Sequence, residues 1–364
     1  MPVFSTDQFD KACARLGEAV LEPAKWPEII EEFCVSIGAL GALIIQLGDR
    51  TPDVPRTASV NDAISYYFRN GWHKRDIRAR SAPLFLRGQM VVTDEDIVTR
   101  EETRTSPYFN EFFYPNGLAW WAAVGFMAGS DLWGLSILRT APMGPFEQTY
   151  KRLLAPLSQR LTEVSSLSAA VGRISLSSVT NALNAFSQPA VAIDRLGFVL
   201  DANRRAEMLF DAEIRVKDRR LVVSDVEAKH RLETLVDRLL LTSDLAPFPC
   251  DPIVIQRRRN GPIILRTLPV HGAARSPFLG ARAVLTLTTP APREGPKAAL
   301  LAAVFGLTPA EARLAAIIAE GHNPGHAAEE LGISRVTARN QLGAIFAKTA
   351  THRQSELVAL LSRL

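Results

Sequence analysis

The chain has 364 residues, which is long enough for two or three domains that each bury a core of their own. Hydrophobic residues make up 47% and charged residues 22%, an ordinary balance for globular protein that excludes wholesale disorder. The formal net charge of +4 and the pI near 9.1 are mildly basic, which agrees with a nucleic-acid partner without requiring one.

The N-terminus and the cysteines exclude further classes. The start, MPVFSTDQFDK, lacks the basic region and apolar core of a signal peptide, and the longest apolar run, residues 118–129, is too short to span a bilayer. Cys13, Cys34 and Cys250 show neither metal-site spacing nor a disulfide framework. We therefore expect a cytoplasmic protein with no metal site and no membrane segment.

Residues 1–145 alternate between helical and strand patterns. Helices are expected over 5–21, from 26 onward, over 61–72 and over most of 94–113, and strands over 42–47, 90–92, 118–127 and 132–138. The last two strands would form a hairpin around residues 128–131. This order predicts a three-layer α/β/α sandwich, and it resembles a GAF-like sensor domain.

Aromatic residues gather in the same segment, which contains all five tryptophans. Aromatic walls with a few polar groups suit a pocket for a small apolar or amphipathic ligand, although a sandwich core uses the same residues. The candidate ligand-binding residues are Tyr66, Trp72, Asp76, Phe109, Trp120 and Trp121.

The string YFRNGWHKRD, residues 67–76, resembles the Tyr/Trp-then-Asp run of LuxR-type autoinducer-binding domains. That resemblance implies that Asp76 accepts a hydrogen bond from a ligand amide and that Trp72 forms the neighbouring wall. The chain departs from the family at Ile77, where a proline is usual. The alternative is a solvated Asp76 beside basic neighbours.

Residues 146–187 predict connecting helices. A long helix is expected over 144–172 with a kink at Pro156, followed by a second helical stretch over 174–186. Leu154, Leu157, Leu161 and Val164 keep near-heptad spacing, so these helices could pair in a homodimer. Packing against their own domain is the other interpretation.

Residues 188–289 have β texture. Hairpins are expected around residues 195–197 and around Asn260-Gly261, with a helix over 203–210 and a last strand over 283–288. Two strands, helices and three strands resemble a PAS-like domain, with Asp201-Ala202-Asn203 at its strand-to-helix corner. Neither Cys250 nor His230 has the setting of a cofactor ligand, so no cofactor is expected.

Residues 290–298 form a Pro-rich linker, and residues 299–364 predict an all-α domain of four helices. Thr308 and Glu311 make a capping box with Pro309 at the first helical position, and Gly321 ends that helix. A second helix follows Asn323, and Ser334 caps a third after the turn at residues 331–334.

The third helix carries basic and amide side chains and no acidic residue from Ser334 to Thr349. Its spacing, with Leu307-Thr308 and Glu311 upstream, resembles the LuxR/FixJ-type helix-turn-helix. The departures, chiefly Asn323-Pro324-Gly325-His326, mean that the target sequence of that family does not carry over. The expected DNA-binding residues are Ser334, Arg335, Thr337, Arg339, Asn340, Gln341 and Lys348.

No Gly-rich phosphate loop, nucleophile elbow or Cys-x-x-Cys is present in the sequence, so we expect no enzyme. The sequence favours a transcriptional regulator, a homodimer on double-stranded DNA whose activity a small molecule tunes by population shift. The alternative is an interaction protein whose helical tail binds another protein.

Overall fold

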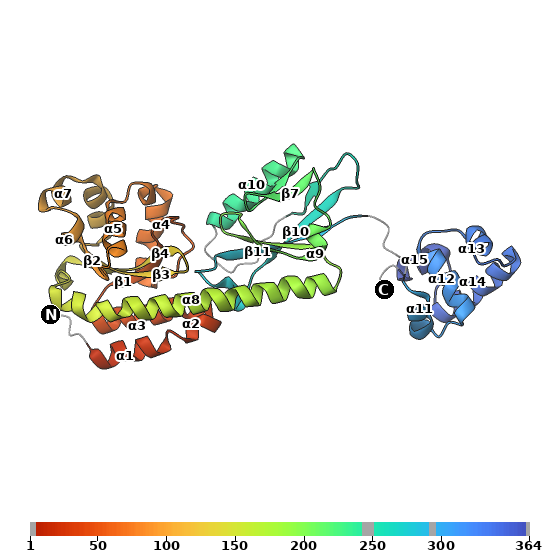
Figure 1. Cartoon of the computed structure of the whole chain (residues 1–364), viewed down its shortest axis with the longest axis horizontal. Coiled ribbons are helices and arrows are strands. Elements are labelled where there is room, and N and C mark those ends of the chain that lie inside the picture. Colours follow the sequence, from red (N-terminus) through yellow and green to blue (C-terminus); the bar gives the residue numbers. More distant parts are fainter. Residues whose placement is uncertain (1–4, 242–250, 291–295, 362–364) are drawn as a thin grey trace. The chain divides into compact units, whose positions relative to one another are not determined.

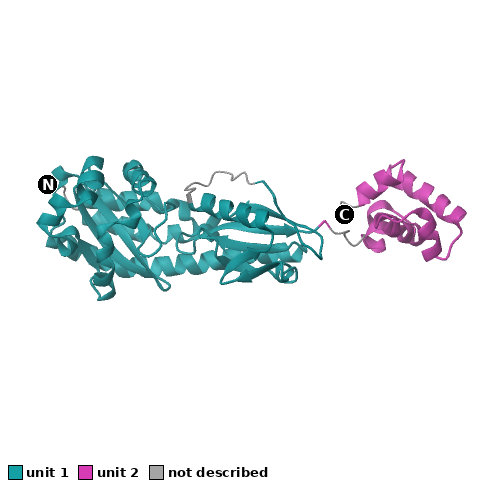
Figure 2. Cartoon of the chain, turned by 90° about the horizontal axis from the view of Figure 1, so that it is seen from above, with its two compact units in different colours: residues 1–289 teal, residues 290–364 magenta. Residues whose placement is uncertain are grey.

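A computed structural model describes residues 5–241, 251–290 and 296–361, and the chain separates into two units, residues 1–289 and 290–364 (Figure 2). The boundary falls at the start of the expected linker. Most of that linker and Cys250 lie outside the described residues. The protein is multidomain and mixes helices with sheets (Figure 1).

The N-terminal module is built on a four-stranded antiparallel sheet. Its strands, in spatial order, are β1 (Gly41–Gln46), β4 (Asp131–Arg139), β3 (Trp120–Ala128) and β2 (Val91–Thr93). Gly129 and Ser130 join β3 to β4, and Gly129 has a φ of 63°. Glycine suits this turn because L side chains rarely adopt that conformation.

Helices cover both faces of this sheet, giving three layers (Figure 1). On one face lie α1 (Thr6–Arg15), α2 (Glu18–Leu21), η1 (Pro23–Lys25), α3 (Trp26–Ile37) and the long α8. On the other lie η2 (Ala58–Val60), α4 (Asn61–Arg69), η3 (Trp72–Lys74), η4 (Ile77–Ser81), α5 (Ala82–Leu86), α6 (Asp94–Ile97), α7 (Arg100–Thr105), the π-helical turn η5 (Tyr108–Phe113) and η6 (Tyr114–Asn116).

Helix α8 (Gln148–Ala185) runs 38 residues, after the short turn η7 (Ala141–Met143), and contains Pro156. The expected break between two connecting helices is therefore absent: α8 is one helix. Its first half buries Leu154, Leu157 and Leu161 against the N-terminal module, and its second half buries Leu176 against the central module. Packing against its own domains occurs, while Leu167 and Ile174 stay 54% and 69% exposed.

The central module holds a five-stranded antiparallel sheet. Its spatial order is β6 (Val199–Ala202), β5 (Ala190–Asp194), β11 (Ala281–Thr288), β10 (Ile263–Pro269) and β9 (Ile253–Ile255). Between β6 and β9 come α9 (Arg204–Glu207), a hairpin of β7 (Ile214–Lys217) and β8 (Arg220–Val223), and α10 (Val226–Leu241); η8 (Gly272–Arg275) precedes β11.

The C-terminal unit contains five helices among the residues described, where four were expected. They are α11 (Ala298–Phe305), α12 (Pro309–Ala319), α13 (Pro324–Glu330), α14 (Arg335–Thr349) and α15 (Gln354–Leu361). The additional helix is α11, whose sequence AALLAAVF is rich in good helix formers and ends at Gly306 in a left-handed cap. Leu301 of α11, Leu314, Ile318, Ile345 and Leu357 share one core.

No single helix among the described residues is both long enough and apolar enough to span a membrane. Helices α11 and α12 reach that length and hydropathy only when taken together, and they are bent by 115° relative to each other.

Gly172 provides a test of the contact between α8 and the central module. A Cβ atom there would lie 2.9 Å from the Ala273 carbonyl oxygen and 3.1 Å from Ser276 Cβ. Alanine normally stabilises a helix, but here we expect Gly172→Ala to destabilise by about 1–3 kcal/mol through overpacking. Thermal unfolding of the full-length chain measures this, with Gly17→Ala, which has open space, as the control. A melting temperature that rises in both variants would contradict the contact.

Candidate functional site

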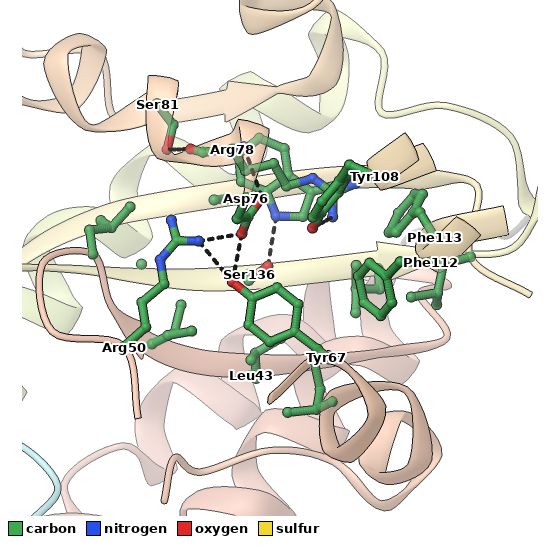
Figure 3. Close-up of a pocket in the computed structure, with 18 residues that line it drawn as sticks. Leu43, Arg50, Tyr67, Asp76, Arg78, Ser81, Tyr108, Phe112, Phe113 and Ser136 are labelled. Carbon is green, nitrogen blue, oxygen red and sulfur yellow. Dashed lines mark hydrogen bonds and ion pairs between the residues drawn. The ribbon is translucent and has the colours of Figure 1, made fainter. Parts of the chain in front are cut away.

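A cavity in the N-terminal module lies between one face of the sheet and the helical layer from α4 to η5 (Figure 3). Its apolar wall comes from β1, α4, η5 and β4, including Leu43, Ile64, Phe112, Phe113 and Leu138. Charged and hydroxyl side chains complete it: Arg50, Tyr67, Asp76, Arg78, Ser81, Tyr108 and Ser136. An apolar enclosure with a few fixed polar groups is the usual form of a small-molecule site.

Asp76 is held by three donors at one end of the cavity. Arg50 forms an ion pair with its Oδ2, and the Tyr67 hydroxyl donates to the same oxygen over 2.8 Å. Asp76 also caps η4, because its Oδ1 accepts the backbone N–H of Arg78 at 2.9 Å. The Arg50 and Asp76 side chains are 7% and 8% exposed, so the expectation of a solvated Asp76 is wrong.

A second buried ion pair, between Arg78 and Asp94, lies beside the cavity, which Arg78 lines. Arg78 donates through Nε to Asp94 Oδ1 at 3.1 Å and through Nη1 to the Tyr108 hydroxyl at 3.0 Å. Its guanidinium carbon lies 3.9 Å from the centre of the Phe113 ring, a cation–π contact. Asp94 also accepts the backbone N–H of Trp121 at 3.1 Å, which ties the pair to β3.

The protonation states of this network follow from burial and neighbouring charge. Burial opposes the charge of Arg78, but the nearby Asp94 and Tyr108 outweigh it and raise the pKa of Arg78. Burial, and then the charge of Asp76, raises the pKa of Tyr67 well above its usual value. The Tyr67 hydroxyl therefore stays protonated and remains a donor at neutral pH.

The free volume inside the cavity is about 50 Å³. That is room for only a few water molecules, whereas ligand sites usually span about 300–1,000 Å³. A ligand can enter only if a side chain of the wall moves. Arg50 is a long wall side chain that is suited to this, because it lies in the irregular loop after β1 rather than in a helix or strand.

The structure brings two of the six candidate ligand residues, Asp76 and Trp121, to the cavity. The other four do not line this cavity. Trp120 points to the opposite face of the sheet, because neighbouring residues of a strand alternate. Tyr66 is 37% exposed and stacks on Phe112. Trp72 and Phe109 are buried within the aromatic core behind the cavity wall.

Sequence reasoning missed Arg50, Tyr67, Arg78 and Tyr108. The signal that could have found Arg78 is Asp-x-Arg at residues 76–78, because a cap residue orients the next turn. Asp94 directly follows the buried strand β2, where a carboxylate needs a partner. Arg50 carries no local signal, since its partner is 26 residues away.

A second candidate site is the exposed face of α14 in the C-terminal unit. The Ser334 side chain caps α14 by accepting the N–H of Thr337 at 3.0 Å, and Arg335 reaches Glu329 at 3.2 Å. Arg339 and Asn340 are exposed on the same face as Val336, which is 70% exposed. This face therefore presents cationic, amide and methyl groups together.

Two of the expected DNA-binding residues, Lys348 and Gln341, are not free on this exposed face. Lys348 donates to Glu311 at 2.7 Å, linking the end of α14 to the capping box of α12. Gln341 is half-buried, and its Oε1 atom is enclosed without a hydrogen-bond partner in the described chain. In addition, no group of three or more His, Cys, Asp or Glu residues among those described is arranged to hold a metal.

The two buried arginines should differ in what their loss costs. Arg78→Met would leave Asp94 buried without its charge partner, and we expect a loss of about 3–5 kcal/mol. Arg50→Met should cost less, because Asp76 keeps the Tyr67 hydroxyl and the Arg78 N–H. Urea unfolding followed by tryptophan fluorescence reports on this module. Equal losses in the two variants would contradict the difference.

Lys348 and Glu311 predict a pH dependence. Lys348, with the Thr308 N–H, lowers the pKa of Glu311, so its carboxylate stabilises the fold above the unfolded pKa of about 4.3. That stabilisation is lost as the pH falls through the folded pKa. Hydrogen exchange in α12 and α14 should show Lys348→Met less protected than wild type at neutral pH, with the difference shrinking in acid. Arg313→Met, which alters an exposed residue, is the control; a pH-independent difference would refute the linkage.

No protein-family model matches the chain, and no curated protein sequence does. Among solved structures, the VqsR LBD domain from Pseudomonas aeruginosa is 18% identical, covering 43% of this chain and 94% of that chain with a TM-score of 0.33. The E. coli DhaR(N)–DhaL complex is 11% identical, covering 76% of this chain and 86% of that chain with a TM-score of 0.25. The phage VqmA–DPO complex is 14% identical, covering 51% of this chain and 87% of that chain with a TM-score of 0.20. TM-scores this low do not establish a shared fold.

Proposed function

We propose that this chain is a transcriptional regulator that binds double-stranded DNA through α14 and responds to a small molecule held in the N-terminal module. The observation that carries the proposal is the exposed face of α14. It presents Arg339 and Asn340 beside a capped N-terminus, and α14 contains no acidic residue. Arginine and asparagine are the side chains that pair most specifically with guanine and adenine edges.

The arrangement of the C-terminal unit supports a LuxR/FixJ-type helix-turn-helix. Helices α13 and α14 are joined by residues 331–334, in which Gly332 has a φ of 64° and Ser334 is the cap. In such a motif the second helix enters the major groove, and Ser334 with Thr337 would contact the backbone phosphates. Gln341 and Lys348 are left out of this interface, because Gln341 is half-buried and Lys348 is bonded to Glu311.

The two sheets support a sensory role for the rest of the chain. The three-layered N-terminal module is compatible with a GAF-like sensor. The central five-stranded sheet, with α9, the β7–β8 hairpin and α10 between β6 and β9, is compatible with a PAS-like domain. In the cavity, Arg50 is the donor that a ligand would draw away from Asp76. The exposed Leu167 and Ile174 of α8 lie about two helical turns apart on one face, so they would pair two copies in a homodimer. A dimer doubles the DNA contacts of a weakly basic unit.

A second candidate function is a protein-binding tail, and Val336 is the observation that favours it. An apolar side chain that is 70% exposed on α14 could enter a groove on a protein partner instead of contacting a thymine methyl. The two functions differ in salt dependence, since DNA binding weakens steeply as salt rises and an apolar contact does not.

The test is retention of sheared genomic DNA by the full-length protein at moderate salt, followed by sequencing. We expect discrete sites with paired half-sites, because a dimer reads two. On such a site Arg339→Ala should lose about 1–3 kcal/mol of binding free energy if Arg339 reads a guanine.

Arg313→Ala, in α12, is the matched control and should bind as wild type. Circular dichroism establishes that both variants are folded. Unchanged affinity of a folded Arg339→Ala protein would remove α14 as the reading helix, and the absence of any enriched DNA site would favour the protein-binding tail.

A further inference from the structure

A second hollow, here called the outer depression, lies beside the cavity and has the larger free volume, about 310 Å³. It is bounded by α4, by the loop after β1 and by Leu240 of α10, so both modules of the first unit contribute to it. Its volume falls within the usual range for ligand sites, whereas the 50 Å³ cavity does not.

Arg50 and Ile64 line both hollows and thus form the wall between them. Ile64 is fixed in α4, but Arg50 is a long side chain on an irregular loop. Its guanidinium faces inward, toward Asp76 and Tyr67 (Figure 3). Rotation of this one side chain would join the two hollows.

The polar lining of the outer depression is basic. Arg50, Arg56 and Arg69 contribute to it, and its described lining contains no Asp or Glu. Arg69 is exposed and donates to the Ser65 carbonyl oxygen at 3.4 Å, a long bond to a neutral acceptor. Burial, and then Lys74, lowers the pKa of His73, so His73 is a neutral group here. Ile64, Phe68 and Leu240 supply apolar surface.

We propose that the outer depression binds a small carboxylate with an apolar body, whose carboxylate is held by Arg69 and by Arg50 after Arg50 leaves Asp76. The inference rests on the proposed ligand sensing by this module and not on DNA binding. A guanidinium holds a carboxylate through two parallel hydrogen bonds, and the walls of Phe68 and Leu240 would cover the apolar body.

Asp76 keeps two hydrogen-bond donors when Arg50 moves to the ligand. When Arg50 leaves, Asp76 still accepts from the Tyr67 hydroxyl at 2.8 Å and from the Arg78 N–H at 2.9 Å. Its carboxylate is therefore not left without partners, which is the outcome that makes breaking a buried pair costly. Arg50 in turn receives the carboxylate of the ligand.

The same loop connects Arg50 with the central module. One residue further on, the Thr51 hydroxyl accepts from Arg195 Nη1 at 2.9 Å, and the Asp53 carbonyl oxygen accepts from the same atom at 3.1 Å. The Asp53 carboxylate pairs with Arg282. A movement of Arg50 would therefore displace Thr51 and Asp53, which Arg195 of the central module bonds. Ligand binding would then shift the equilibrium between the bonded and the released form of this loop.

The experiment is calorimetric titration of the full-length chain, without DNA, with acetate, hexanoate, octanoate and phenylacetate. Octanamide and inorganic phosphate are the matched comparisons. We expect a carboxylate with an apolar body to bind at least about tenfold more tightly than octanamide and than phosphate. Arg69→Gln and Arg50→Gln should each weaken binding about tenfold or more, and Arg152→Gln, exposed on α8, should leave it unchanged.

Hydrogen exchange gives the second readout: saturating octanoate should change exchange in residues 47–57 and around Arg195. Absence of carboxylate binding to folded protein, equal binding of octanamide, or full affinity in Arg69→Gln would each overturn the proposal. Arg69 lies on the surface, so its variant keeps the test meaningful if Arg50→Gln is unstable. Carboxylate binding by a chain that retains no DNA would leave this site standing and remove the regulator.

Discussion

The first unit depends on one physical constraint, which is that its two larger sheets, of four and five strands, are packed against the single helix α8. Leu157 anchors the helix to the N-terminal module, and Leu176 anchors it to the central module. Between them, the Ser168 and Ser276 hydroxyls lie 2.8 Å apart and Gly172 lets the backbone of η8 approach closely. The two modules also meet at other contacts, including the loop after β1, where Arg195 bonds Thr51 and Asp53.

Those remaining contacts combine apolar packing with buried charge: Phe278 of the central module packs on Trp26, Phe126 and Trp133. Arg50 and Arg78 are enclosed in the N-terminal module, and Arg195 and Arg282 are enclosed where the central module meets it. Buried ion pairs add little net stability, because desolvation offsets much of their attraction, but breaking one is costly. Arg50, Arg78 and Arg282 each have a carboxylate partner, whereas Arg195 is bonded to a hydroxyl and to two carbonyl oxygens.

The C-terminal unit is organised differently, through local caps and a small apolar core. Thr308, Asn323 and Ser334 each cap a helix with their own side chain. Glu311 then links the cap of α12 to Lys348 at the far end of α14. The Glu311–Lys348 bond fixes the end of α14 to α12, while Arg339 and Asn340 of α14 remain exposed.

The sequence by itself determined the capped helix starts of the C-terminal unit and the β3–β4 hairpin, because these depend on groups three residues apart or on a single turn. Thr308 with Glu311, Ser334 and Gly129 all lie where the local pattern indicated. The tertiary structure alone decided which side chains meet. Tyr67 rather than Tyr66 and Trp121 rather than Trp120 face the cavity, since a shift of one position reverses the side of a strand or turns a helix away. Partners distant in sequence, Arg50 with Asp76 and Lys348 with Glu311, are joined only by the packing of whole elements, for which no local pattern exists.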